Sequence, residues 1–408
     1  RGGAITLVSQ ATTVVLQLAS TVVLARMLTP DDYGVMGMVL SFVALAALFK
    51  DLGLSSAAIQ KANLTVEQQS NLFWINTLFG LGLTLVFAAA APLVAWFYDR
   101  PELLGLTWVL SLTFVLGGLS AQHNAMLVRH MQFGRQAIVN ISGIAVTFAV
   151  SVALAYLGYG FWALGWGHVS GAAARTLLIW AFSPFVPGGW KRGAGTMDMI
   201  RFGANVTGLN SANYFSRNLD NILIGKFVGA DTLGVYGRAY QLMLFPVQNL
   251  RAPIDAVTYP ALCRLQDNPE EWRRYHMQTL RVLSFLTMPL VAWMYLVSEP
   301  LIPLLLGEKW AGVIPIFRIL VLVAFIQPSA SMVGSVMLSL GLTRRYFWQG
   351  AAMAAFISVC FAIGINWGAQ GVAWAYVAAI YLALVPLLWV TYRGTALAVI
   401  DFFDSVPF

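Results

Sequence analysis

Eight charged residues interrupt stretches of the sequence that are otherwise apolar, and side chains of this kind are candidates for binding a charged ligand or ion. They are Lys50, Asp51, Arg175, Arg217, Asp220, Arg238, Arg251 and Asp255. If these stretches cross a membrane, each charge costs about 2.5 to 3.5 kcal/mol at the bilayer centre and has to face protein or water. The residues therefore predict a polar site inside an apolar protein.

Two interpretations of these charges stay open. Arg217 and Asp220 are three residues apart, and Arg251 and Asp255 are four apart, so each pair can bond along one face of a helix. Such pairing could serve only to hold helices together, and we give it the same weight as a role in binding.

Basic residues outnumber acidic ones in the predicted site. The bases are Arg26, Lys50, Arg217, Arg238 and Arg251, and the acids are Asp51, Asp220 and Asp255. A net positive charge favours an anionic ligand, and the paired donors of arginine match a phosphate group. We predict a cationic, substrate-binding cavity in which the acids form ion pairs or bind a coupling ion, H⁺ or Na⁺.

Neutral polar residues follow one face of two predicted helices. The first helix carries Gln10 and Gln17, and the other carries Asn210, Asn213, Tyr214 and Asn221. Their spacing of three and four residues places each set on one helix face. Hydrogen bonding between helices is the alternative. We favour a water-filled cavity because both stripes run over three turns and coincide under the repeat described next.

The sequence repeats itself at an offset of 200 residues. Residues 26–37 align without a gap on residues 226–237, with the Asp, two Gly and the Val identical and the leading base kept basic. Two similar halves that each hide a polar stripe predict a cavity shared between them.

The sequence has no motif for metal binding, a disulfide, nucleotide binding or nucleophilic catalysis. His123 and His168 have no second His or Cys at ligand spacing, and Cys263 and Cys360 fall in different predicted helices, so we expect no metal site and no disulfide. A Gly-rich phosphate loop and a Ser/His/Asp set are also missing. We therefore expect no cofactor and no catalytic activity.

Composition sets the class of protein. Of 408 residues, 59% are hydrophobic and 10% are charged, whereas soluble domains contain about 25% charged residues. The mean hydropathy is +0.73. We predict an all-α, polytopic membrane protein, and we assign the net charge of +7 to membrane-flanking loops rather than to nucleic-acid binding.

Apolar runs of about 20 residues, the length that crosses a bilayer, predict about twelve transmembrane helices. Their ranges are 4–26, 34–60, 71–98, 103–128, 136–157, 160–182, 199–228, 232–262, 279–298, 312–340, 346–365 and 371–392. Thirteen Lys and Arg residues fall in the loops after even-numbered helices and five in the others. The positive-inside rule then places the amino terminus and the even-numbered loops in the cytoplasm.

A Pro- and Gly-rich segment divides the chain. We predict a six-helix lobe over residues 1–183, a flexible cytoplasmic linker at 184–198, a second six-helix lobe at 199–393, and a polar tail or the start of further helices at 394–408. Lobes with even helix counts insert in the same direction.

Several motifs resemble those of the Wzx-type polysaccharide flippases, in the superfamily of multidrug, oligosaccharidyl-lipid and polysaccharide exporters. The motifs are ARMLTPDDYG at 25–34, DLGL at 51–54, RFG at 201–203, NLDNILIG at 218–225, LGVYGRAY at 233–240 and YPAL at 259–262. Together they cover nearly the whole chain, and they are most similar to colanic-acid-type exporters.

The resemblance implies two six-helix lobes around a cavity that opens alternately to each side. It implies a substrate made of an oligosaccharide on undecaprenyl diphosphate, moved across the bacterial inner membrane for lipopolysaccharide or exopolysaccharide biosynthesis. It also implies contact with membrane lipids, and with a polysaccharide polymerase and other export machinery. Many relatives carry fourteen helices, whereas twelve are predicted here.

Two other functions remain as alternatives. A cation-coupled drug antiporter of the same superfamily should have a cavity rich in acids, but bases prevail here. An integral-membrane polymerase or glycosyltransferase should have a sizeable loop outside the membrane, but the longest predicted connectors have about sixteen residues.

Overall fold

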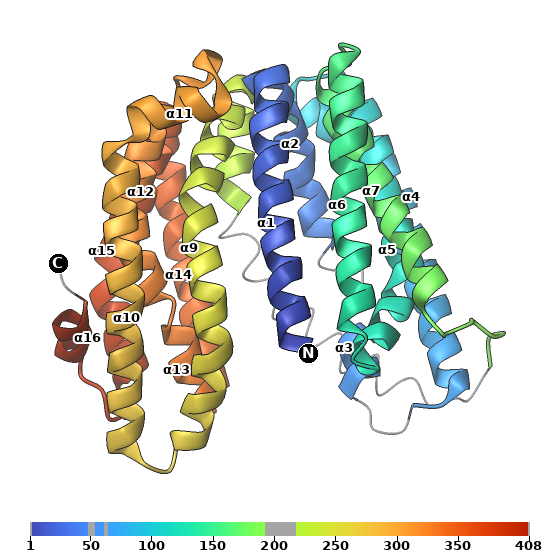
Figure 1. Ribbon diagram of the computed structural model, residues 1–408. Helices are drawn as coiled ribbons and strands as arrows, with labels where there is room; N and C mark the ends of the chain where they lie inside the picture. Colours follow the sequence, from blue (N-terminus) through green and yellow to red (C-terminus); the bar gives the residue numbers. More distant parts are fainter. Residues whose placement is uncertain (1, 48–53, 61–63, 192–217, 407–408) are drawn as a thin grey trace. The chain divides into compact units, whose positions relative to one another are not determined.

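The computed structural model describes residues 2–47, 54–60, 64–191 and 218–406. These residues form α-helices and short connections, and within these ranges there is no β-strand. The chain divides into two compact units, Arg1–Ser211 and Ala212–Phe408. Each unit is described in turn (Figure 1).

The first unit is built from antiparallel helices joined by tight turns. Its helices are α1 (Gly2–Met27), α2 (Pro30–Ala47), α3 (Leu54–Gln60), α4 (Val66–Tyr98), α5 (Glu102–Arg129), α6 (Phe133–Tyr156) and α7 (Phe161–Phe182). Within the predicted helix at 34–60, the described residues form α2 and α3, and residues 48–53 between them lie outside the described residues. The other spans agree with the prediction to within a few residues, because turn residues such as Pro101 and Gly160 mark their ends.

Glycines let helices of the first unit approach each other closely. A Cβ on Gly80 of α4 would lie 2.6 Å from the carbonyl oxygen of Phe114 on α5, and one on Gly118 would meet the carbonyl of Asn76. Small residues at helix contacts are typical of membrane proteins, where van der Waals packing replaces the hydrophobic effect as the driving force.

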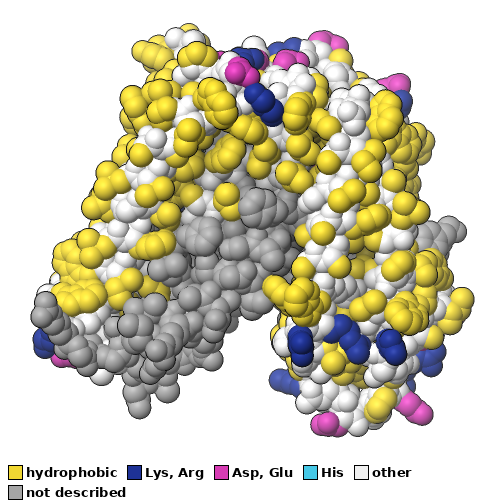
Figure 2. All heavy atoms as spheres, turned by 180° about the vertical axis from the view of Figure 1, so that it is seen from behind, with side chains coloured by type: hydrophobic (Ala, Val, Ile, Leu, Met, Phe, Trp, Pro, Cys, Tyr) yellow, Lys and Arg dark blue, Asp and Glu magenta, His cyan; other side chains and the backbone are white. Residues whose placement is uncertain are grey.

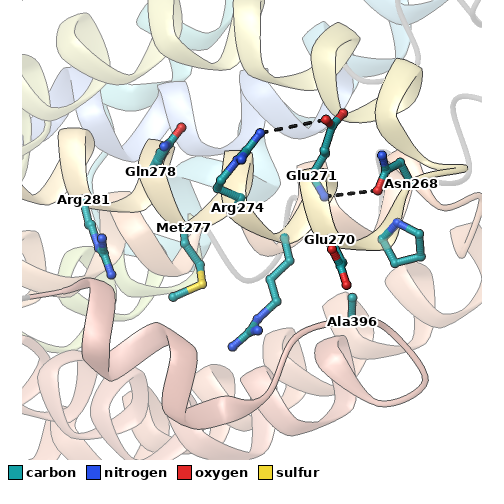
Figure 3. Close-up of a pocket in the computed structure, with 10 residues that line it drawn as sticks. Asn268, Glu270, Glu271, Arg274, Met277, Gln278, Arg281 and Ala396 are labelled. Carbon is teal, nitrogen blue, oxygen red and sulfur yellow. Dashed lines mark hydrogen bonds and ion pairs between the residues drawn. The ribbon is translucent and has the colours of Figure 1, made fainter.

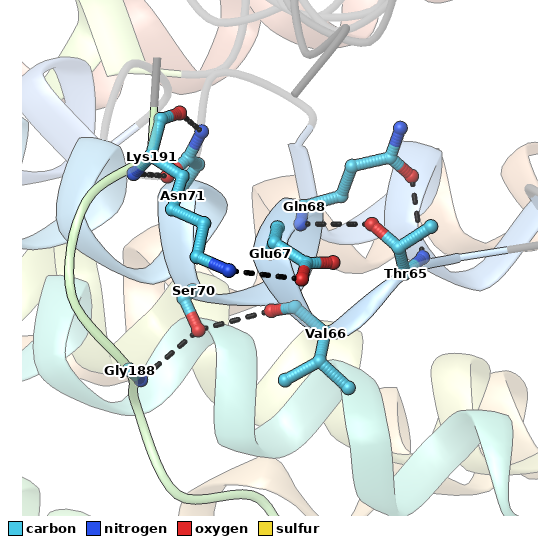
Figure 4. A network of polar contacts seen from close by, with 8 residues as sticks. All are labelled: Thr65, Val66, Glu67, Gln68, Ser70, Asn71, Gly188 and Lys191. Atoms are coloured by element: carbon cyan, nitrogen blue, oxygen red, sulfur yellow. Dashed lines mark hydrogen bonds and ion pairs between the residues drawn. The ribbon is translucent and has the colours of Figure 1, made fainter. Parts of the chain in front are cut away.

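The segment directly after α7 is hydrogen-bonded to α4 (Figure 4). The side chain of Asn71 donates to the carbonyl of Lys191 at 2.7 Å and accepts from its N–H at 3.0 Å. Ser70 accepts from the N–H of Gly188 at 3.0 Å, and Trp74 donates to the Gly188 carbonyl at 2.8 Å. We name residues 183–191 the strap; the backbone groups of its Gly188 and Lys191 are bonded to α4. The rest of the predicted linker lies outside the described residues.

The second unit begins in the described chain with a helical stretch at 218–227. There follow α9 (Ala230–Leu265), α10 (Pro269–Leu296), α11 (Ser298–Leu306), η1 (Glu308–Trp310), α12 (Val313–Ala330), α13 (Val333–Ser339), α14 (Thr343–Gly364), η2 (Ile365–Trp367), α15 (Gly368–Tyr392) and α16 (Val399–Ser405). Two expectations are corrected. Helix α10 starts ten residues before the predicted 279, with Asn268 as its cap and Pro269 in its first turn.

The second correction concerns the first of two alternatives for residues 394–408, which were expected to be a polar tail or the start of further helices. Their helix α16 packs against α10 and α15 (Figure 1). Phe402 and Val406 are fully buried there, in the same hydrophobic cluster as Trp272 and Leu388. Arg273 of α10 forms two hydrogen bonds with the Asp401 carboxylate, at 2.6 and 3.1 Å. Apolar burial and this ion pair together hold the segment.

The exterior confirms a polytopic membrane protein. Seven helical segments of the described chain are long and apolar enough to cross a membrane, and the last of them, Thr343–Tyr392, contains both α14 and α15. Hydrophobic side chains cover the sides of the helices in Figure 2, and Lys and Arg lie near helix ends. The count of twelve remains a prediction.

The turn between α1 and α2 recurs in the second unit at the predicted offset. Helix α2 begins at Pro30 and α9 at Ala230, and each follows a helix that ends three residues earlier. Most buried positions also coincide: 24, 25, 30, 33–36 and 39 are buried, and so are 224, 225, 230, 233–236 and 239, whereas 28 and 38 are buried and 228 and 238 are not. The internal repeat is therefore present in the structure as a shared helix-turn-helix with the same inward face.

Candidate functional site

A buried carboxylate lies in the second unit, close to its repeated turn. The side chain of Asp220 is 4% exposed and accepts a hydrogen bond from the Tyr236 hydroxyl of α9 at 3.0 Å. Its other oxygen accepts from the backbone N–H of Asn221 at 2.8 Å. A buried acid requires such donors because desolvation is costly.

Tyrosines continue this polar region through the unit. Tyr236 stacks on Tyr240, with ring centroids 6.3 Å apart, and Tyr240 lies 6.2 Å from Tyr376 of α15. The Tyr376 hydroxyl accepts from the amide of Gln327 on α12 at 3.1 Å. These aromatic residues were not predicted as site residues; the spacing of Tyr236 and Tyr240 on one helix face was the available sequence signal.

Two predicted arginines of α9 have partners on the same helix. Arg251 Nε lies 2.7 Å from Asp255 Oδ2, which confirms the predicted i, i+4 pairing. Arg238 donates to Gln241 at 2.6 Å. Both arginines are partly buried, and their partners sit on the same helix face. These contacts favour ordered arginine side chains; they do not test whether the arginines bind a ligand.

The remaining predicted residues fall into two groups. Gln10, Gln17 and Arg26 are exposed on α1, and Asn221 is partly buried beside Asp220. The second group lies outside the described residues and consists of Lys50, Asp51, Asn210, Asn213, Tyr214 and Arg217. The cationic cavity predicted from both halves therefore remains a prediction.

Arg175, the one intramembrane charge that the prediction left out of the site, faces a cavity in the first unit. The cavity has a volume of about 180 Å³ and lies between α2, α5 and α7. Its lining is Val43, Thr113, Phe114, Leu116, Gly117, Ser120, His168, Ala172, Arg175 and Thr176. No acidic residue is among them. The predicted site lies on the helices joined by the two repeated turns. Because α7 is not one of these helices, Arg175 was left out.

A larger groove lies at the start of α10 (Figure 3). Its volume is about 920 Å³, and it is bounded by the amino-terminal turns of α10 and by Ala396. Arg274 is 3.9 Å from Glu271, while Arg281 and Met277 lie along the groove. The acidic side chains of Glu270 and Glu271 offset much of the basic charge there, so the groove does not form a strongly cationic site.

Metal ligation finds no support in the geometry. Within the ranges that the structure describes, no three His, Cys, Asp or Glu residues lie close enough together to hold a metal ion.

Membrane-length helices, a repeated helix-turn-helix and charges buried among apolar helices define a polytopic α-helical membrane protein with two repeat-related units. The chain belongs to the polysaccharide biosynthesis protein family, whose model matches residues 23–315. This confirms the resemblance to the Wzx-type flippases.

Known proteins agree with this assignment. The lipopolysaccharide biosynthesis protein WzxC of Escherichia coli is 27% identical over 79% of this chain and 66% of its own length. This chain thus spans about two thirds of that relative. The teichuronic acid biosynthesis protein TuaB of Bacillus subtilis is 25% identical over 89% of this chain and 76% of its own length. Among solved structures, the lipid II flippase MurJ in an inward closed conformation superposes with a TM-score of 0.81, at 15% identity, over 99% of this chain and 89% of MurJ.

Proposed function

We propose that this protein is a flippase that moves lipid-linked oligosaccharide units across a membrane for the assembly of a cell-surface polysaccharide. The observation that carries the proposal is the family match over residues 23–315. The fold shared with MurJ and the buried carboxylate of Asp220 are consistent with it. A substrate of this kind joins a diphosphate, a sugar chain and a long apolar tail, so it needs polar surface within a lipid-facing protein.

The carrier and the location are finer parts of the same proposal. Undecaprenyl diphosphate is the proposed carrier, and the bacterial inner membrane is the proposed location. The amino terminus is proposed to be cytoplasmic from the distribution of basic residues along the sequence. Within the second unit, the basic loops at the α9–α10 and α13–α14 turns lie at one end (Figure 1). Polymerase and other export proteins are proposed partners, and no catalytic step is assigned to the chain.

Asp220 is the proposed coupling residue. The Asp220 carboxylate is buried and accepts hydrogen bonds from one tyrosine and one backbone N–H, and such a group can exchange a proton or bind Na⁺. Its protonation or Na⁺ occupancy can then differ between two conformations of the protein. The bound ion can shift the conformational equilibrium only by its difference in affinity for the two states.

Reconstitution tests the flippase activity. The purified chain is placed in vesicles that carry a fluorescent undecaprenyl-diphosphate oligosaccharide in both leaflets, and a membrane-impermeant quencher is then added. Flipping should raise the quenched fraction above the outer-leaflet share seen in protein-free vesicles. A quenched fraction equal to that of protein-free vesicles, with correctly folded protein present, would reject the proposal. Efflux of a cationic dye in the same vesicles would instead support a drug antiporter.

The ion gradient tests the coupling. Flipping by the native chain should accelerate when a proton or Na⁺ gradient is imposed, and Asp220→Asn should lose that acceleration. An Asn variant that responds fully to the gradient eliminates Asp220 as the coupling residue.

A further inference from the structure

The Arg175 cavity contains a cation for which the structure describes no counter-ion. Throughout the described part of the chain, no ion pair or hydrogen bond involves the Arg175 guanidinium, and no carboxylate lines the cavity. Helix α7 packs between α5 and α6, which are both long and apolar enough to span a membrane. A charge in such surroundings has to be balanced by water or by a ligand.

The helices around Arg175 provide space for its side chain. A Cβ on Gly143 of α6 would collide with Cγ and Nε of Arg175, so the glycine allows the arginine stem to cross the surface of α6. On the same two helices, a Cβ on Gly167 or Gly171 would collide with Ser151 or Thr147. Close α6–α7 packing thus fixes the course of the Arg175 stem beside the cavity that this residue lines.

The hydroxyl groups of the cavity leave the arginine as its main donor. Thr113 donates to the Leu110 carbonyl at 2.6 Å, and Ser120 donates to the Gly117 carbonyl at 3.0 Å. Thr176 donates to the carbonyls of Leu116 and Ala172. Because these hydroxyl hydrogens are engaged, Arg175 is the charged hydrogen-bond donor among the described lining residues.

Size and charge together define the class of ligand. The cavity has a volume of about 180 Å³. Pockets that bind drug-sized molecules have volumes of at least roughly 300 Å³, so a sugar chain does not fit. A single phosphate group does fit, and arginine binds phosphate through two parallel hydrogen bonds.

We propose that Arg175 and the cavity between α2, α5 and α7 form a binding site for a phosphate group, and that this group belongs to the diphosphate of the transported lipid. The second part of the proposal rests on the proposed function; the first part does not. Free inorganic phosphate or pyrophosphate has the same chemistry and is the alternative source of the group.

Binding is tested on the full chain in detergent with pyrophosphate as the probe. Pyrophosphate should raise the melting temperature of the native chain more than chloride at equal ionic strength, because a ligand that binds the folded state stabilises it. Arg175→Gln should weaken the apparent affinity by at least about tenfold, as expected for loss of a charge-assisted hydrogen-bond pair. Arg175→Lys keeps the charge and should weaken it less.

Two further variants separate the site from general effects. Arg281→Gln removes an exposed arginine of α10, outside the cavity, and should leave pyrophosphate binding unchanged. Ala172→Leu fills the cavity while keeping Arg175 and should abolish binding. A native chain without a pyrophosphate-specific shift, or an Arg175→Gln variant that keeps it while folded and monodisperse, would overturn the site.

Flipping in vesicles distinguishes the source of the phosphate. If the native chain flips the lipid-linked oligosaccharide and Arg175→Gln flips it poorly, the site takes the lipid diphosphate. If Arg175→Gln flips normally but has lost pyrophosphate binding, the site takes a free anion, and the assignment to the lipid is wrong. If the native chain flips no lipid-linked substrate but binds pyrophosphate through Arg175, the proposed function fails and the anion site remains.

Discussion

The Asp220 carboxylate depends on a tyrosine that lies sixteen residues further along the chain, beyond the repeated turn. Tyr236 is fully buried, so its hydroxyl and the carboxylate satisfy each other away from water. In the first unit, Met36 is equivalent to Tyr236 and Ser20 is equivalent to Asp220. The two repeats therefore share a backbone and an inward face, but only the second carries a buried acid with its donor.

Removing the Tyr236 hydroxyl should destabilise the protein. In Tyr236→Phe, Asp220 loses its side-chain donor in a buried place, which costs about 1 to 3 kcal/mol. The melting temperature in detergent should fall, whereas Tyr156→Phe, at a position 83% exposed, should leave it unchanged. Equal effects of the two substitutions would show that the Asp220 hydrogen bond contributes nothing specific.

Spacing along one helix was enough to predict the Arg251–Asp255 ion pair, because residues four apart on a helix face are always neighbours. It was not enough to find the partner of Asp220, since contacts across a turn depend on how two helices cross. Arg175 was visible in the sequence as an intramembrane charge, but its cavity is formed by three helices whose packing the sequence does not reveal.

Helices α10 and α16 are held together at one end by an acid whose ionisation is favoured in the fold. Two hydrogen bonds from Arg273 lower the pKa of Asp401 below its ordinary value, and the Asp401 side chain also accepts from the Ala398 N–H at 2.9 Å. A lowered pKa means that the stabilisation is complete above the unfolded value of about 3.9 and is lost as the pH falls through the folded value.

Asp401→Asn should therefore lower the melting temperature at pH 7 by a few degrees, and the difference from the native chain should shrink as the pH is lowered toward 3. Asp404→Asn is the matched control, because Asp404 is an exposed acid of the same helix. If the difference between Asp401→Asn and the native chain stayed constant with pH, ionised Asp401 would not be what docks α16.

Glycines at the α4–α5 contact allow a second prediction at the scale of elements. Gly80→Ala places a methyl group 2.6 Å from the Phe114 carbonyl oxygen and should lower the melting temperature. Gly82→Ala meets no atom within 4 Å and should be neutral or stabilising, since alanine favours helix by about 1 kcal/mol over glycine. A thermal melt of both variants checks this. The reverse order would mean that the two helices adjust freely.

Apolar runs and turn residues predicted most helices because a membrane-spanning helix is itself an apolar run. The same rule failed for the first ten residues of α10, where Glu270, Glu271 and Arg274 are polar although the helix has already begun. The short helices α11 and α16 were missed for a related reason: at nine and seven residues they are too short to span a membrane, and packing against longer helices stabilises them.

For the molecule as a whole, the sidedness of the loops is the main testable expectation. In a chain without Cys263 and Cys360, a cysteine at Arg344, in the first turn of α14, should be protected from an impermeant maleimide added to intact cells. A cysteine at Glu308, in the loop after α11, should react. Both positions are exposed, so access differs only by side of the membrane. Equal labelling of the two would refute the predicted topology.

The hydrogen bonds between the strap and α4 determine where a force along the chain would act on the first unit. A pull transmitted along the covalent chain from the second unit would reach the first unit through Lys191, and the hydrogen bonds of Asn71 and Ser70 would carry it into α4 before it reached the end of α7. Asn71→Ala should therefore release residues 183–191 to rapid hydrogen exchange, while Asn140→Ala, on the exposed face of α6, should not. Unchanged exchange in Asn71→Ala would mean that this load path does not depend on Asn71. The chain that leads to the second unit is thus anchored to the first unit at α4 as well as at the end of α7.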